Sequence, residues 1–472
     1  MKLTAWIDGA GFLAVVALIA WVGQQRTRSA AGYMVAGRSI GLGALVATLV
    51  MTEFNTSTLL AFAAAGYSAG PMALALPAVF LIGLAFYTIT VAKAWKRFDR
   101  LSVAELFAAR YSPALGRLAS ALLLVAMVGF SATYVKSLTL LFAPFAGGVP
   151  AWVLSAVLTV VVLSVVIGGG LVSIVRADQV SFWITLALLP VLGVLGWWHA
   201  QQGGGLASAF PANQRVIDPV AQWQHAALPM RFVTSLVVLT CFTYIAAPWY
   251  GQKIFAARDE RTAFTAVGLS AVLVFVLYGS MVFAAACLRV ELPHLTDAQT
   301  AVPEMVRRWL PAGVRGAGFA VLFAAALTTL AGVWSAMATM IAADFGPGGA
   351  TVRGQQRLMA AFAIVSWLGA NLLVDDILNR LILANIPVAA LAFALLAGFH
   401  WPRATTAGAW ASVVVGMTWG VWCFVTIGEA GMYTWDWGVY GIPLIFATGI
   451  AVSLLTPRTM PARPDVEAAP SS

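Results

Sequence analysis

Long apolar segments alternate along the chain with short connectors that are charged or rich in proline and glycine. A helix of about 20 mostly apolar residues can cross a bilayer. The pattern predicts about 13 transmembrane helices, at Trp6–Val22, Ile40–Tyr67, Met72–Ala94, Leu118–Phe142, Trp152–Ile167, Val180–Trp198, Arg231–Tyr250, Thr262–Leu288, Gly316–Ala343, Leu358–Val374, Leu381–Phe399, Ala407–Ile427 and Val439–Leu455. The segments lack the alternation of a β-barrel, so their backbone hydrogen bonds must be satisfied within helices. We therefore predict an all-α integral membrane protein.

The composition agrees with a membrane protein and leaves little chain for a soluble domain. Of the 472 residues, 61% are hydrophobic and 10% are charged, against roughly a quarter charged in soluble domains. The three cysteines, Cys241, Cys287 and Cys423, lie in or at the end of apolar segments without metal-binding spacing, so no disulfide framework or zinc site is expected. No nucleophile triad, phosphate loop or metal cluster indicates an enzyme, and no cofactor is expected.

The net charge of +9 follows from membrane topology rather than from a nucleic-acid partner. With the N-terminus outside, most basic residues fall in cytoplasmic connectors, among them Arg26, Arg28, Arg38, Lys93, Lys96, Arg97, Arg100, Arg110, Arg117, Arg176, Lys253, Arg258, Arg261, Arg353, Arg357, Arg403, Arg458 and Arg463. Fewer fall outside: Lys2, Arg215, Arg289, Arg307, Arg308, Arg315 and Arg380. The positive-inside rule then predicts an outside N-terminus and a cytoplasmic C-terminus.

Two of the expected spans carry features that interrupt a helix. The second contains the polar run "TEFNTST" (residues 52–58), and the seventh has Pro248 within "TCFTYIAAPWYGQKIFAARDE". Proline lacks a backbone donor and clashes with the preceding turn. Secondary transporters often place interrupted helices at matching positions of two inverted repeats, with the binding site between them. Interruptions five spans apart fit that pattern.

Several motifs, in order along most of the chain, resemble the sodium:solute symporter family. They are "GYMVAGRSIG", "GYSAG", "DRLSVAELFAARYS", "GGGLVSIVRADQ", "GQKIFAARDERTA", "AAALTTLAGVWSAMATMIAADF" and "RATTAGAWASVVVGM". The resemblance implies an inverted 5+5 helix repeat core with one extra N-terminal and two extra C-terminal helices. The expected parts are the first helix and a cytoplasmic basic loop (1–38), the first repeat (39–200), the second repeat with two outer loops (201–400), two C-terminal helices (401–456) and a short cytoplasmic tail (457–472).

The resemblance also implies a sodium site between the second and ninth spans. Its ligands would be backbone carbonyls at the break, around Met51 to Phe54, the hydroxyls of Thr328 and Thr329, and the carbonyl of Ala325. Oxygen ligands from unwound backbone and hydroxyls suit a hard cation. Alternatively, the two hydroxyls bond back to carbonyls of their own helix.

Asp178 matches a family aspartate tied to sodium release or to a second sodium site. It could instead be a carboxylate favoured by the dipole at a helix N-terminus. Family members with a second sodium carry extra serines where this chain has Ala331 and Gly332, so the resemblance implies one coupling ion.

Glu53 is the only acidic residue that the predicted spans place well inside the membrane. Such residues are costly and usually mark an ion or substrate path. The proline-transporter branch has a carboxylate at this place that is tied to sodium coupling. Glu53 is therefore a candidate for ion coupling, for contact with a substrate amine, or for carrying a proton. A structural carboxylate with a buried partner is the alternative.

The candidate substrate pocket lies around the two interruptions: Asn55, Thr56, Thr58, Lys136, Tyr244, Trp249 and Gln252. Lys136 either faces this pocket or extends its ammonium to the outer interface. The aromatic residues either wall the pocket or serve as packing and interfacial anchors. The sugar-transporting branch of the family has glutamine where this chain has Thr58, which counts against a sugar.

These features predict a sodium-coupled symporter of the cell inner membrane that imports a small polar organic solute by alternating access. Sodium is the expected coupling ion, and a monomer or loose homodimer is expected. A symporter coupled to protons through Glu53 is the alternative within this class. A transporter-like sensor or channel is the alternative from another class, although the short tail after Leu455 offers no output domain.

Overall fold

The computed structural model describes residues 2–23, 34, 36–146, 148–168, 170–224, 227–346 and 351–457. These residues form helices and no strands; their one extended pairing is an isolated parallel bridge between Ile40 and Ala257. The all-α prediction is confirmed for this part of the chain. The predicted basic loop around Arg26 and Arg28, and the tail from Arg458 on, lie outside the described residues.

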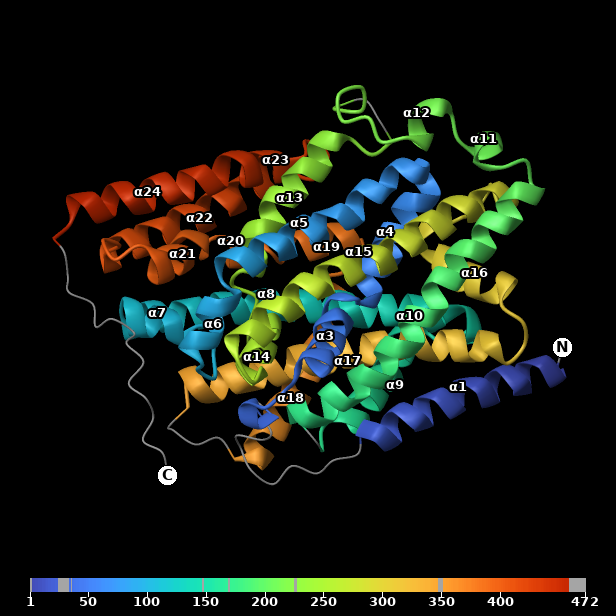
Figure 1. Cartoon of the computed structure of the whole chain (residues 1–472), viewed down its shortest axis with the longest axis horizontal. Coiled ribbons are helices and arrows are strands. Elements are labelled where there is room, and N and C mark those ends of the chain that lie inside the picture. The colour runs from blue at the N-terminus through green and yellow to red at the C-terminus, as the bar shows by residue number, and fades with distance from the viewer. Residues whose placement is uncertain are drawn as a thin grey trace.

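Long helices make up most of the bundle (Figure 1). They are α1 (Lys2–Gly23), α5 (Ala75–Thr90), α8 (Pro113–Phe142), α10 (Gly170–Gln202), α15 (Glu260–Glu291), α17 (Val314–Asp344), α18 (Val352–Leu372), α22 (Thr406–Thr426) and α24 (Ile442–Leu455). Other helices are parts of broken spans: α3 (Leu42–Glu53), α4 (Thr56–Ala69), α13 (Met230–Tyr244), α14 (Pro248–Ala256), α19 (Ile377–Leu383), α20 (Ile386–Ala389) and α21 (Ala392–His400). The remaining elements are the apolar helix α9 (Ala151–Val166) and the shorter η1 (Ala36–Arg38), η2 (Gly70–Leu74), α6 (Ala92–Phe98), α7 (Glu105–Arg110), η3 (Ala143–Phe145), α11 (Leu206–Ala209), α12 (Ala212–Arg215), η4 (Ala298–Thr300), α16 (Ala301–Trp309), α23 (Tyr433–Trp435) and η5 (Asp436–Gly441).

Within the described ranges, 8 helices are long and apolar enough to cross a membrane, or up to 10 if each bent pair counts as one span. The expected number of 13 is therefore not confirmed. Two of the expected spans contain apolar helices that are too short, Leu42–Glu53 and Ala151–Val165. A third, α18, is long enough but begins with the polar and basic sequence "VRGQQR".

Both predicted interruptions are present. The second span breaks after Glu53, where Asn55 is extended and caps α4 by accepting a hydrogen bond from the Thr58 N–H at 2.8 Å. The break therefore lies at Phe54 and Asn55, later than the predicted start at Met51, which is still helical. In the seventh span α13 and α14 meet at 49°. Pro248 opens α14, at a position where its missing N–H costs no helical hydrogen bond.

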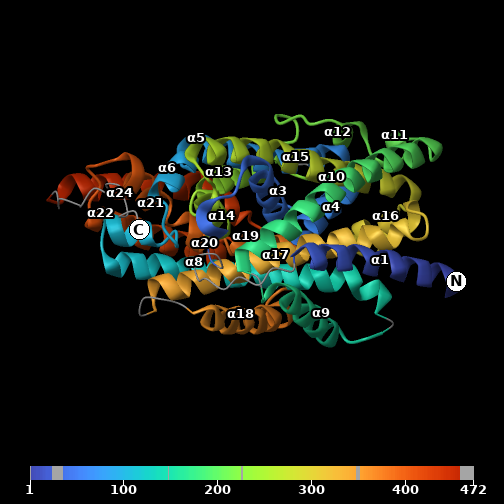
Figure 2. The same ribbon diagram turned by 60° about the horizontal axis from the view of Figure 1, so that its bottom comes forward.

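The start of α3 and the end of α14 lie side by side. The Ile40 N–H donates to the Ala256 carbonyl at 3.0 Å, and the Arg258 N–H donates to the Ile40 carbonyl at 3.1 Å. α17, whose middle is almost wholly buried, packs against α1, α3, α8, α14 and α18. Figures 1 and 2 show α1 at one edge of the bundle and the pair α22 and α24 at the opposite edge. The start of α3 and the end of α14 are thus tied together, and both helices pack against the buried α17.

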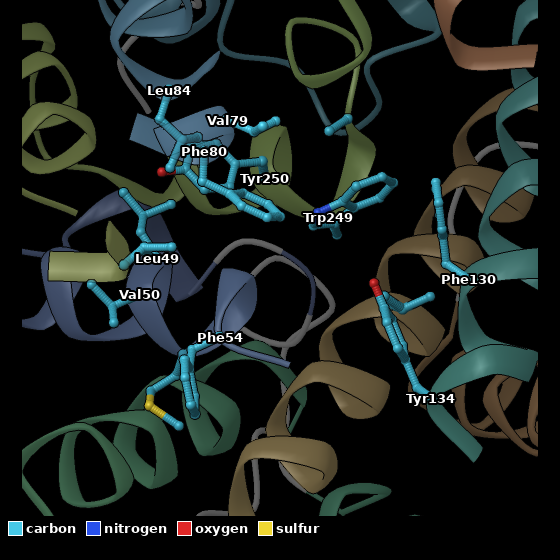
Figure 3. Close-up of a cluster of buried hydrophobic side chains, with 14 of the residues drawn as sticks. Leu49, Val50, Phe54, Val79, Phe80, Leu84, Phe130, Tyr134, Trp249 and Tyr250 are labelled. Carbon is cyan, nitrogen blue, oxygen red and sulfur yellow. The ribbon is translucent and has the colours of Figure 1, made fainter. Parts of the chain in front are cut away.

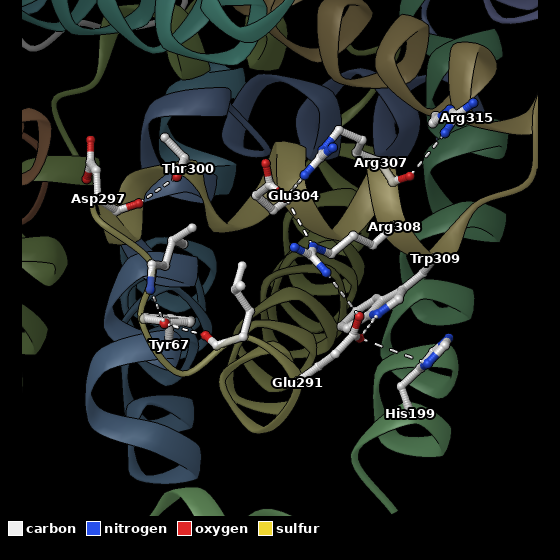
Figure 4. A network of polar contacts seen from close by, with 12 residues as sticks. Tyr67, His199, Glu291, Asp297, Thr300, Glu304, Arg307, Arg308, Trp309 and Arg315 are labelled. Atoms are coloured by element: carbon white, nitrogen blue, oxygen red, sulfur yellow. Dashed lines mark hydrogen bonds and ion pairs between the residues drawn. The ribbon is translucent and has the colours of Figure 1, made fainter. Parts of the chain in front are cut away.

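A polar network ties together the end of the bundle where α1 begins (Figure 4). The Glu291 carboxylate, at the end of α15, accepts a hydrogen bond from the Trp309 indole at 2.8 Å and lies 3.4 Å from an Arg308 nitrogen. His199 of α10 lies 4.0 Å away. The connector predicted between residues 289 and 315 therefore contains a helix, α16, held against α10 and α15.

Candidate functional site

A hollow of about 670 Å³, counted with its opening to solvent, lies where the two predicted breaks meet. Its lining comes from α4, α5, α8, α13, α14, α19 and η5, and it is mostly apolar. Among the predicted pocket residues, Asn55, Thr58, Tyr244 and Trp249 line it. Further polar groups come from Tyr134, Thr240, Thr243, Asn385 and Trp437. No acidic or basic side chain of the described residues lines it.

Aromatic rings form one wall of this cavity. Trp249 packs edge-on against Phe130 with ring centroids 5.0 Å apart, and the Tyr134 hydroxyl points toward Trp249 (Figure 3). Tyr244 packs edge-on against Phe80 at 5.8 Å. Tyr250 is fully buried behind this wall, against Tyr87 at 5.2 Å. Tyr244 and Trp249 therefore face the cavity, whereas Tyr250 does not line it.

Glu53 ends α3 directly behind the wall. Its side chain is 1% exposed, and its Oε1 has no hydrogen-bond partner among the described residues. The carboxylate lies beside the side chains of Tyr244 and Trp249. The Glu53 carbonyl accepts a hydrogen bond from the Tyr278 hydroxyl at 2.6 Å. The break therefore holds a buried carboxylate next to the cavity, separated from it by two side chains that line it.

Four of the five predicted sodium ligands form an oxygen cluster where α17 meets α3: Met51, Ala325, Thr328 and Thr329, but not Phe54. The Thr329 hydroxyl lies 2.8 Å from the Ala325 carbonyl and 3.2 Å from the Met51 carbonyl, and the Thr328 hydroxyl lies 3.4 Å from the Ala325 carbonyl. Both hydroxyls thus contact a carbonyl of their own helix, as the alternative interpretation expects, but Thr329 also reaches the second span. Phe54 packs its ring against Tyr278 at 5.0 Å.

A buried ion pair next to this cluster was missed by the sequence interpretation. Lys253 was expected in a cytoplasmic connector, which is wrong: its side chain is 1% exposed within α14. Its Nζ lies 3.0 Å from an Asp178 carboxylate oxygen and 2.9 Å from the Thr48 carbonyl, and it also contacts the Thr52 hydroxyl. The available signal was that Lys253 is the only charged residue of the mostly apolar run "IAAPWYGQKIFAA".

Asp178 lies deeper than predicted. The expected span began at Val180, but α10 begins at Gly170, so Asp178 lies more than two turns inside the helix and is fully buried. The interpretation as a helix N-terminal carboxylate is therefore wrong, and Glu53 is not the only acidic residue inside a span. Thr48 and Thr328 lie beside the Asp178 carboxylate.

Three predicted pocket residues do not line the cavity. The Thr56 hydroxyl pairs with Ser137 at 2.7 Å. The Gln252 amide donates to the Met34 carbonyl at 2.8 Å and contacts Ser335 and Thr339. Lys136 lies partly buried on α8. The cavity residues on α8 and α19 had no distinctive sequence signal, because their meeting depends on how distant helices pack.

Comparison with known proteins gives a family and a fold. The model of the sodium:solute symporter family matches residues 33–416. The sodium/pantothenate symporter of Escherichia coli (strain K12) is 28% identical over 411 residues, covering 81% of this chain and 82% of that protein. The uncharacterized symporter YidK of the same organism is 23% identical over 351 residues, covering 70% and 60%.

Solved structures show the same fold. A Na⁺-coupled sialic acid symporter in a substrate-bound outward-open state has a TM-score of 0.79 and 17% identity, with 97% of this chain and 99% of that chain covered. An Eremococcus coleocola manganese transporter has a TM-score of 0.52 and 14% identity, covering 91% and 94%. The family match includes both predicted breaks, the oxygen cluster and the buried ion pair. This chain is therefore a multi-pass, sodium-coupled membrane transporter rather than an enzyme, and it belongs to the sodium:solute symporter family.

Proposed function

We propose that this protein imports a small organic carboxylate together with sodium by alternating access. The observation that carries the proposal is the cavity at the meeting point of two broken helices. Asn55, which lines the cavity, follows Met51 by four residues, and Met51 belongs to the oxygen cluster with Ala325, Thr328 and Thr329. Broken helices that meet at a binding site are the architecture of many secondary transporters. Sodium and solute would bind at neighbouring positions of the same break.

The oxygen cluster supports a sodium site. Two backbone carbonyls and two hydroxyls converge there from α3 and α17, and all of these groups are buried. The hydroxyls now donate to the carbonyls. Rotation of each hydroxyl would turn its oxygen toward a cation, which the carbonyls would also coordinate, and oxygen ligands suit hard cations. We assign the carbonyls of Met51 and Ala325 and both hydroxyls to this site.

The cavity chemistry supports a carboxylate that also carries hydrogen-bond donors. The N-termini of α4 and α14 both border the cavity through Asn55, Thr58 and Trp249, and helix N-termini attract anionic groups. Hydroxyl side chains from α8 and α13, and the amide of Asn385 just before α20, offer further hydrogen bonds. Glu53 lies behind Tyr244 and Trp249. Its carboxylate would attract the hydrogen-bond donors of a solute bound in the cavity.

Pantothenate has this chemistry, because it combines one carboxylate with an amide and two hydroxyls. It is also the solute named for the 28% identical symporter of Escherichia coli. Pantothenate is therefore the first solute to test. Zwitterionic amino acids share the carboxylate and the donors and form the second group.

We also propose the expected domain plan for this transport cycle. Residues 39–200 and 201–400 would form two inverted five-helix repeats, with the N-terminus outside and the C-terminus in the cytoplasm. The two breaks, at Phe54 and before Pro248, would then occupy matching positions of the repeats. In support of this plan, both breaks border one cavity, and the residue before α3, Ile40, pairs with the residue after α14, Ala257.

Proton coupling through Glu53 is a second candidate, favoured by one observation: this fully buried carboxylate leaves Oε1 without a partner in the described part of the chain. A carboxyl group in that position could bind a proton from one side and release it to the other. This candidate predicts uptake driven by a pH gradient without sodium.

A binding screen tests the proposed solute class. The purified protein would be heated with pantothenate, amino acids, sugars or nucleobases, in sodium chloride or in choline chloride. We expect pantothenate or an amino acid to raise the melting temperature by several degrees in sodium chloride only. Stabilisation by a sugar or nucleobase alone would overturn the carboxylate assignment, and equal stabilisation in choline chloride would argue against a shared sodium site.

A further inference from the structure

A groove between α1, α17 and the end of α8 shares no lining residue with the solute cavity. Its volume is about 810 Å³, counted with its open side, and Asp8 is its only charged lining residue within the described ranges. Four phenylalanine side chains line it, namely Phe12, Phe142, Phe145 and Phe319. Their rings pack edge-on, with centroids 5.8 Å apart for Phe12 and Phe142 and 4.5 Å apart for Phe145 and Phe319. The groove therefore offers an apolar, aromatic surface.

The groove opens on a part of the surface that faces lipid. α1 lies at one edge of the bundle (Figures 1 and 2) and is long and apolar enough to cross a membrane. Leu13, which lines the groove, is 65% exposed, and Trp6 and Trp21 on the same helix are 78% and 72% exposed. Large apolar side chains exposed on a membrane-spanning helix contact lipid. Acyl chains of the surrounding bilayer therefore reach the groove.

Charged side chains border one end of the groove. A recess that shares Asp8, Phe145 and two other lining residues with the groove is also lined by Arg307 and Arg315. The Arg315 guanidinium lies 2.7 Å from the Asp8 carboxylate and donates to the Arg307 carbonyl at 3.2 Å (Figure 4). The Arg307 side chain is 50% exposed and lies 2.7 Å from Glu304. Two guanidinium groups and a carboxylate therefore lie where the aromatic groove ends.

We propose that the groove and the recess together bind one phospholipid whose headgroup carries a primary ammonium, of which phosphatidylethanolamine is the simplest. An acyl chain would lie on the phenylalanine rings, and the phosphate would accept hydrogen bonds from Arg307 and Arg315. Guanidinium groups suit phosphate oxygens, with which they form strong charge-assisted hydrogen bonds. This inference goes beyond the proposed function and does not depend on the solute or the coupling ion.

The charges around the recess select the headgroup. Asp8 pairs with Arg315, and Glu304 pairs with Arg307. Because these four charges cancel, they give an anionic headgroup no net attraction. A zwitterionic headgroup complements a rim of both signs, with its phosphate on the guanidinium groups and its ammonium beside Asp8. A primary ammonium has three N–H donors for the carboxylate, whereas the trimethylammonium group of phosphatidylcholine has none.

Counting bound lipid tests the proposal. The purified full chain would be stripped of lipid in detergent and titrated with phosphatidylethanolamine, and mass spectrometry of the intact protein would count the bound molecules. We expect the first molecule to bind with a Kd about tenfold below that of phosphatidylcholine or diacylglycerol with the same chains, because a hydrogen bond to a charged group contributes about the free energy of a tenfold change. Equal Kd values for these three lipids, or a lower Kd for phosphatidylglycerol than for phosphatidylethanolamine, would overturn the proposal.

Arg307→Gln tests the phosphate contact. The amide brings no charge to the phosphate, so the Kd of the first lipid should rise about tenfold. The control, Arg308→Gln, removes the neighbouring arginine, which also contacts Glu304 but lines neither the groove nor the recess. Its Kd should stay within about twofold of wild type. If both variants weaken lipid binding equally, the Arg307 guanidinium does not hold the phosphate and the proposal is wrong.

Gly9→Leu tests the acyl-chain contact without changing any charge. Gly9 lines the groove, and a side-chain carbon there meets no atom of the described residues within 4 Å. Leucine would therefore fill the groove without displacing the protein, and we expect the tight first lipid to be lost. Ala10→Leu, which adds similar bulk at an exposed position outside the groove, should bind the lipid as wild type does. Unchanged binding of the first lipid by Gly9→Leu would contradict the proposal.

A second copy of the chain is another occupant that the same mass spectra detect. We expect wild-type protein to carry the lipid as a monomer in detergent. If it instead forms a dimer that Gly9→Leu separates, and binds no lipid tightly, the groove is an interface between two copies and the lipid proposal is wrong.

Discussion

Glu53 lies between the proposed sodium site and the cavity. It lies two residues after Met51, whose carbonyl meets Thr329, and its carboxylate lies beside two residues of the cavity wall. The main chain at this point is fixed by Tyr278, which accepts a hydrogen bond from the Asn55 N–H at 3.0 Å and donates one to the Glu53 carbonyl. The carboxylate therefore lies at a fixed point of the break, against Tyr244 and Trp249 of the cavity wall.

Glu53→Gln should weaken solute binding more than sodium binding. The amide keeps the shape of the side chain but removes its charge, so we expect the solute KM to rise about tenfold or more, a loss of about 1.4 kcal/mol. Half-maximal sodium should stay within about threefold of wild type. Initial uptake rates over a range of solute and sodium concentrations measure both. Glu260→Gln, which removes a more exposed carboxylate paired with Arg97, is the control. A larger change in half-maximal sodium than in the solute KM would place Glu53 at the ion site.

Thr329→Ala should weaken the activation of uptake by sodium. It removes the hydroxyl that joins α17 to the Met51 carbonyl, so we expect the sodium concentration for half-maximal uptake to rise at least tenfold, with Thr329→Ser close to wild type. Thr328→Ala should act in the same direction. The control, Thr418→Ala, removes an exposed hydroxyl bonded only within α22. Unchanged sodium activation in both variants at positions 328 and 329 would refute the assignment.

At the scale of elements, the breaks could be predicted because they follow local rules. Asn55 caps α4 and Pro248 opens α14, and both residues have known positional preferences. The bend of 43° between α20 and α21 was missed. The pairing of Lys253 with Asp178 could not be read from the sequence either, because it joins residues 75 positions apart on α14 and α10, two helices that both pack against α3.

Close packing of α4 on α15 depends on a glycine. A side-chain carbon at Gly66 would overlap the main chain of Val282, which cannot move aside as a flexible side chain could. Gly66→Ala should therefore lower the free energy of unfolding by about 1–3 kcal/mol, the usual range for overpacking. Thermal unfolding measures this loss. Gly43→Ala, on α3 with open space around it, should unfold close to the wild-type temperature. Equal losses of stability in Gly66→Ala and Gly43→Ala would show that α4 and α15 do not pack this closely.

At the scale of the whole molecule, one sodium ion supplies enough energy for concentrative uptake. Its passage down a membrane potential of about 100 mV releases roughly 2.3 kcal/mol, and a tenfold sodium gradient adds about 1.4 kcal/mol. Together these support accumulation of a neutral solute by several hundredfold; an anionic solute carried with one sodium moves no net charge and gains the gradient part only. The charge of the solute therefore decides whether the membrane potential contributes.

Uptake into proteoliposomes tests sodium coupling most directly. The reconstituted protein would be given labelled pantothenate, or the carboxylate that stabilises it most, under an inward sodium gradient alone or an inward proton gradient alone. We predict accumulation above the outside concentration under the sodium gradient only, increasing about tenfold for each tenfold increase in that gradient. Accumulation driven by the proton gradient in the absence of sodium would contradict sodium coupling and would favour a proton carried on Glu53.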